Sequence, residues 1–107
     1  MDTRKTRTSE AYFVVKRMLS REELLVQTAE ECAELAKAAL KLRRVLDGTN
    51  PTPVSQEEAE ANLQEEMSDV IGCMLLVDID WEALEQMLPF KMQRWASRLE
   101  RKGANDG

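Results

Sequence analysis

The chain of 107 residues contains no histidine, the side chain whose pKa lies closest to neutral pH. This absence excludes hydrolases built on Ser–His–Asp or Cys–His pairs, and it excludes the Glu-x-x-His ligands of ferritin-like di-iron bundles. Any catalysis by this protein must therefore depend on carboxylates, lysine or arginine.

Aromatic residues make up only 5% of the chain, whereas six methionines and many alanines and leucines favour helices over strands. No apolar run approaches the ~20 residues that span a bilayer, so we expect no membrane partner. The two cysteines, Cys32 and Cys73, lie on or beside the expected inner faces of helices, where a free thiol packs as a small hydrophobic group. With no signal peptide, we expect free thiols and a cytoplasmic protein.

Positive charge is also scarce, because the net charge is −5 and the sequence pI is about 4.8. This balance opposes binding to a nucleic-acid polymer or an anionic membrane. A polyanionic small molecule needs metal ions or local basic residues to offset its charge. At this length the chain is one domain, residues 1–107, near the lower limit for a self-sufficient core, which favours a homodimer or homotetramer.

The periodicity predicts an all-α fold, a bundle of four to five helices with frayed tails at residues 1–7 and 103–107. Ser20 with Glu23, and Ser55 with Glu58, have the form of capping boxes, and Asp80 can cap a last helix. The expected helices run over residues 9–19, 21–46, 55–77 and from 81 onward, with a kink or a restart at Phe90 caused by Pro89. The Gly- and Pro-containing segment 47–53 is expected to be a connector, or alternatively a flexible rim over a site.

Two acidic stretches, residues 30–34 and 65–69, interrupt apolar helical patterns. The predicted core stripe of the first helix includes Cys32, Leu35 and Ala39, with Glu31 and Glu34 on its edge. In the second, Met67, Val70 and Ile71 belong to the predicted core stripe, with Asn62, Glu66 and Asp69 on its edge. Residues three apart are neighbours on a helix surface, so each edge carries a pair of carboxylates. If the helices pack antiparallel, these carboxylates converge, and a hard divalent cation would relieve their repulsion.

The pattern E-E-x-x-E followed by E-x-x-D resembles the MazG-like (all-α) nucleoside triphosphate pyrophosphohydrolase family. Here it reads Glu30-Glu31-Cys32-Ala33-Glu34-Leu35 and Glu66-Met67-Ser68-Asp69-Val70, and the resemblance covers roughly residues 20–100. The connection between the two motifs is longer than in the family pattern. The resemblance implies a Mg²⁺-dependent hydrolase, with Mn²⁺ as a possible substitute, that cleaves a nucleoside triphosphate to the monophosphate and pyrophosphate.

The resemblance also implies roles for individual residues. Glu31, Glu34, Glu66 and Asp69 would be metal ligands with Glu30 as an accessory carboxylate, and Glu31 or Glu34 would be the general base. Lys91 and Arg94 would bind phosphate, and Asn62, on the same edge as Glu66, is a candidate for contact with sugar or phosphate.

Two alternatives remain open. Phosphoribosyl-ATP pyrophosphohydrolases share the fold and a similar acidic pattern. A non-catalytic helical interaction module accounts for the caps and the amphipathic stripes equally well, but it does not account for carboxylates along both core edges.

Overall fold

A computed structural model describes the backbone of residues 3–51 and 53–106 and the side chains of residues 9–51 and 53–104. The described chain contains four helices and no strand, which confirms the all-α prediction. They are α1 (Thr3–Met18), α2 (Arg21–Asp47), α3 (Gln56–Leu76) and α4 (Trp81–Asp106). The expected frayed tails fall partly outside the described residues, and the described backbone is helical from Thr3 and up to Asp106.

Both predicted capping serines begin their helices. The Ser20 hydroxyl accepts a hydrogen bond from the Glu23 amide at 3.1 Å, and the Ser55 hydroxyl accepts one from the Glu58 amide at 3.1 Å. Each bond satisfies a backbone donor that the first turn of a helix leaves without a partner. These caps set the starts of α2 and α3, as the sequence predicted.

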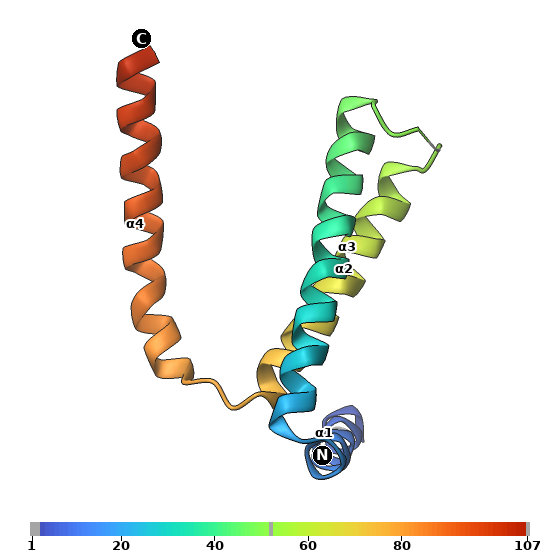
Figure 1. Ribbon diagram of the computed structural model, residues 1–107. Coiled ribbons are helices and arrows are strands. Elements are labelled where there is room, and N and C mark those ends of the chain that lie inside the picture. Colours follow the sequence, from blue (N-terminus) through green and yellow to red (C-terminus); the bar gives the residue numbers. More distant parts are fainter. Residues whose placement is uncertain (1–2, 52, 107) are drawn as a thin grey trace.

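Glycine ends α2. Gly48 adopts the left-handed conformation with φ of 78°, and its cap lets amide groups bond back to the carbonyls of Arg44 and Val45. The chain then reverses through the loop before Ser55, so α2 and α3 form an antiparallel hairpin (Figure 1).

Asp80 begins α4 by accepting a hydrogen bond from the Ala83 amide at 3.0 Å. The helix continues through Pro89 without a break, so the predicted restart at Phe90 is wrong. An interior proline removes one backbone donor and crowds the carbonyl four residues earlier, which weakens the helix at this point although α4 does not end there.

Helix α4 stands apart from the hairpin (Figure 1). Within the described residues, the contact between α2 and α3 is the most extensive one between helices. Helix α4 is exposed along nearly its whole length. A single chain therefore does not close into the expected four-helix bundle.

Helix α1 closes the end of the hairpin opposite the loop (Figure 1). The Lys16 ammonium donates to the Leu76 carbonyl at 2.7 Å and pairs with the Asp78 carboxylate. From the start of α2, the Arg21 guanidinium donates to the Val77 carbonyl at 3.1 Å. Two cations thus hold the last carbonyls of α3, where a helix presents partial negative charge.

The contact between α2 and α3, here called the seam, follows heptad spacing. Leu24, Ala38, Ala59 and Cys73 are its buried residues. Leu24, Glu31 and Ala38 are seven residues apart on α2, and Ala59, Glu66 and Cys73 are seven apart on α3. Antiparallel packing then stacks three layers along the seam, with Ala38 and Ala59 in one, Glu31 and Glu66 in the next, and Leu24 and Cys73 in the third.

Candidate metal centre

The middle layer of the seam holds a group of carboxylates. One oxygen from each of Glu31, Glu66 and Asp69 lies within 4.8 Å of the others. Glu31 and Glu66 are half-buried and Asp69 is exposed. We call these three residues the carboxylate cluster. It brings together the two acidic motifs of the sequence, which belong to different helices.

The cluster has one polar neighbour on its own helix. The Gln27 amide donates to a Glu31 carboxylate oxygen at 2.7 Å, one turn earlier on α2. Among the described side chains, no lysine or arginine forms an ion pair with Glu31, Glu66 or Asp69. The cluster is therefore a concentration of negative charge that no cation on the described side chains offsets through an ion pair.

The electrostatics of Glu66 reflect this concentration. Removal from solvent raises the pKa of the Glu66 carboxyl above its ordinary value, and the negative charges of Asp69, Glu31, Glu34 and Glu65 raise it further. The ionised form of Glu66 is thus destabilised in the folded protein. A bound cation would reverse that penalty.

Glu34 and Glu30 are less central than the motif suggested. Glu34 is exposed, lies outside the group of three oxygens and pairs with the Lys37 ammonium at 3.2 Å, although its charge still acts on Glu66. Glu30 is exposed on the outer side of α2. Asn62 is half-buried one turn before Glu66, on the side of α3 that carries Asp69.

Lys91 and Arg94 do not join the cluster within one chain. Both lie on α4, which is separate from the α2–α3 hairpin (Figure 1). Lys91 lies instead beside an open apolar groove on α4 itself, with Leu84, Met87 and Leu88.

The predicted core stripes are confirmed only in part, because Leu35 and Val70 are half-buried as expected whereas other members are not. Cys32 and Ala39, predicted to be inside, are exposed, and so are Met67 and Ile71. Glu31 and Glu66, which the sequence placed on the edges of these stripes, lie in the seam together with the buried Ala38 and Cys73. The missed signal was the pair of alanines, Ala38 and Ala59, whose small side chains allow close approach of the two backbones one layer away from the carboxylates.

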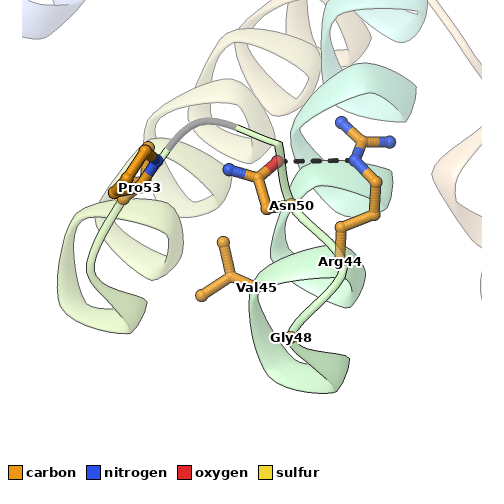
Figure 2. A pocket seen from close by; sticks show the side chains of 6 residues that line it. Arg44, Val45, Gly48, Asn50 and Pro53 are labelled. Atoms are coloured by element: carbon orange, nitrogen blue, oxygen red, sulfur yellow. Dashed lines mark hydrogen bonds between the residues drawn. The ribbon is translucent and has the colours of Figure 1, made fainter.

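The loop between α2 and α3 has a small pocket of its own. It measures about 160 Å³ and is lined by Arg44, Val45, Gly48, Asn50, Pro53 and Val54 (Figure 2). The Arg44 guanidinium donates to the Asn50 side-chain oxygen at 3.5 Å. Arg44 follows Glu31 by thirteen residues, about 20 Å along the helix. The loop is thus a connector with respect to the carboxylate cluster, not a rim over it.

The chemistry of the cluster suits a hard divalent cation. Its donors are carboxylate oxygens from two helices, and Mg²⁺ and Ca²⁺ take oxygen ligands. Around an octahedral Mg²⁺ ion, oxygens on opposite sides lie about 4.2 Å apart and adjacent oxygens about 3.0 Å apart, so the three oxygens of the cluster would have to draw closer together to share one ion. Glu31, Glu66 and Asp69 would hold the ion, and Glu34 is near enough to add its charge.

No family model, no curated protein and no solved structure matches this chain. The resemblance to the MazG-like family therefore depends on the two acidic motifs alone. None of the described helices combines the length and apolar character needed to cross a bilayer.

Proposed function

We propose that this protein is a cytoplasmic, Mg²⁺-dependent nucleotide pyrophosphohydrolase of the MazG-like type, which cleaves a nucleoside triphosphate to the monophosphate and pyrophosphate as a homodimer or homotetramer. The observation that supports this proposal is the carboxylate cluster, in which E-E-x-x-E and E-x-x-D contribute to one group of oxygens. Mn²⁺ is the expected substitute, because carboxylate oxygens also suit that ion.

The carboxylates divide into two roles in this proposal. Glu31, Glu66 and Asp69 hold the cation, which when bound neutralises phosphate charge and lowers the pKa of water. Glu34 lies outside the group of three and pairs with Lys37 through one carboxylate oxygen, so its other oxygen would take the proton from the attacking water. Water adds to the α-phosphorus as the bond to the bridging oxygen breaks, and pyrophosphate leaves. Glu31, the other candidate base, belongs to the group of three oxygens that would hold the cation.

The substrate contacts assigned to Asn62, Lys91 and Arg94 belong to the same proposal. Asn62 lies one turn from Glu66 and is placed to contact sugar or phosphate. Lys91 and Arg94 would neutralise the remaining phosphate charge, which requires α4 to approach a carboxylate cluster.

The experiment is a screen of nucleoside and deoxynucleoside triphosphates for pyrophosphate release with Mg²⁺, with phosphoribosyl-ATP included to test the related pyrophosphohydrolase. We expect Glu66→Gln and Asp69→Asn to abolish release while the helical circular dichroism is retained. Glu65→Gln is the matched control, because Glu65 is an exposed neighbour outside the cluster and its variant should keep the activity. Equal rates for Glu66→Gln and Glu65→Gln would overturn the assigned site.

A helical interaction module is the second candidate, and the large exposed apolar side chains of α4 favour it. This function needs no metal. No pyrophosphate release from any nucleotide, together with an unchanged melting temperature at millimolar Mg²⁺, would select the module over the enzyme.

A further inference from the structure

The described chain leaves two apolar surfaces uncovered. The first, the apolar stripe of α4, lies within an arc of about 80° around the helix and is the most segregated apolar face of the four helices. It consists of Trp81, Leu84, Leu88, Met92, Trp95 and Leu99. Trp95 is 61% exposed and Leu99 is 58% exposed.

The second surface is one side of the α2–α3 hairpin, here called the apolar flank. It consists of Leu25, Cys32, Ala39, Leu46, Met67 and Ile71, all of them exposed. On α2, Cys32 comes one residue after the seam residue Glu31, and Glu34 comes three residues after it. On α3, Met67 and Asp69 follow the seam residue Glu66 at the same two spacings. On antiparallel helices these offsets place the apolar flank on one side of the hairpin and the acidic side chains on the other.

The total exposed area indicates that something covers these surfaces. The chain exposes 8857 Å², whereas a compact monomer of 12.2 kDa exposes about 6,100 Å². The excess of roughly 2,800 Å² exceeds the ~800 Å² per partner that a stable interface buries. The radius of gyration is 18.4 Å, against about 13 Å for a compact domain of this length.

The junction between α3 and α4 opposes closure of α4 onto its own hairpin. Lys16 and Arg21 hold the last carbonyls of α3, and Asp78 adopts a left-handed conformation with φ of 58°. Two residues later Asp80 caps α4. A junction of so few residues, fixed at both ends, directs α4 away from α2 and α3 (Figure 1).

We propose that the apolar stripe of α4 packs on the apolar flank of the hairpin in a second copy of this chain, and that the exchange is reciprocal. The two surfaces match in length, because α4 has 26 residues and α2 has 27. Helix α3, which carries part of the apolar flank, also differs from α4 in net charge, although the acidic side chains of the cluster lie on the other side of the hairpin from the flank. Helix α3 carries six acidic and no basic side chains, whereas residues 91–102 of α4 carry five basic side chains and one acidic one. A two-fold arrangement satisfies both copies at once.

Light scattering on a size-exclusion column tests the proposal, with Trp95→Glu compared with Phe90→Glu. Both aromatics are exposed on α4, but Phe90 lies roughly opposite the apolar stripe. We expect an oligomer at micromolar concentration for the wild type and for Phe90→Glu, and a monomer for Trp95→Glu. Ile71→Glu on the apolar flank should also give a monomer, which keeps the test valid if one variant loses its helical circular dichroism.

Thiol labelling of the unmodified protein supplies a second measurement. Cys32 belongs to the apolar flank and Cys73 is buried in the seam. We expect Cys32 to be protected in the oligomer and to react upon dilution to the monomer, while Cys73 remains protected in both. A wild-type monomer would overturn the proposal, and if Cys32 is protected in that monomer, α4 covers its own hairpin. Neither measurement uses metal or nucleotide, so its outcome is independent of the proposed activity.

Discussion

Glu31 of α2 and Glu66 of α3 meet in the middle layer of the seam, with carboxylate oxygens within 4.8 Å of each other and of Asp69. Heptad positions of this kind are ordinarily apolar, and the layers on either side contain Ala, Leu and Cys. Like charges in a half-buried layer oppose folding. The repulsion in this layer therefore lowers the free energy of unfolding, and a bound cation would offset it.

The first prediction concerns the pH dependence of folding without metal. Because the pKa of Glu66 is raised in the folded state, its stabilising contribution is present at acidic pH and is lost as pH rises through the folded pKa. We expect Glu66→Gln to be more stable than the wild type at pH 7, with the difference shrinking toward pH 4. Urea unfolding in EDTA at fixed protein concentration measures it. Equal stability of the two proteins across this range would contradict the raised pKa.

The second prediction concerns divalent cations. A cation that binds only the folded chain adds about 1.4 kcal/mol at ten times its Kd, which corresponds to several degrees in Tm for a domain of this size. We expect Mg²⁺ or Mn²⁺ to raise the Tm of the wild type and to leave that of Glu66→Gln nearly unchanged. Glu65→Gln should respond as the wild type does. An equal rise in all three proteins would indicate a general salt effect.

The third prediction tests the close approach of α2 and α3. Ala59 is 1% exposed, so Ala59→Leu must force the helices apart and should cost roughly 1–3 kcal/mol of unfolding free energy. Ala61→Leu, two residues along on the exposed side of the same helix, should change stability by less than about 0.5 kcal/mol. Urea midpoints of the two variants give the comparison. If Ala59→Leu is as stable as Ala61→Leu, the seam is not closely packed at that layer.

The fourth prediction compares one substitution at two glycines. Gly48 has φ of 78°, so Gly48→Ala should destabilise the end of α2 by about 1–2 kcal/mol. Gly72 lies inside α3, where an added Cβ meets nothing within 4 Å, so Gly72→Ala should stabilise by about 0.5–1 kcal/mol. Thermal unfolding at equal protein concentration measures both changes. The same sign of change in the two variants would contradict this account of α2 and α3.

The helix starts and the helix stop were determined by the sequence itself, because they depend on contacts within four residues. Ser20, Ser55 and Asp80 cap the helices that follow them, and Gly48 ends α2, as their local patterns predicted. The all-helical class follows in the same way from periodicity. The pairing of carboxylates within each acidic motif could also be read from spacing, since residues three apart share a helix side.

Only the tertiary structure decided which side of each helix faces inward. A stripe of leucines and a stripe one residue away differ by 100° around the helix, and Cys32, Met67 and Ile71 fit the apolar pattern as well as the true seam residues do. The seam lies where Ala38 and Ala59 are buried, and the fit of two helix surfaces is a property of both together. The contacts of Lys16 and Arg21 at the end of α3, from which the chain leaves for α4, likewise join segments about sixty residues apart. Local spacing carries no information about such contacts, and this is why the sequence could name the carboxylates but could not place Lys91 and Arg94 relative to them.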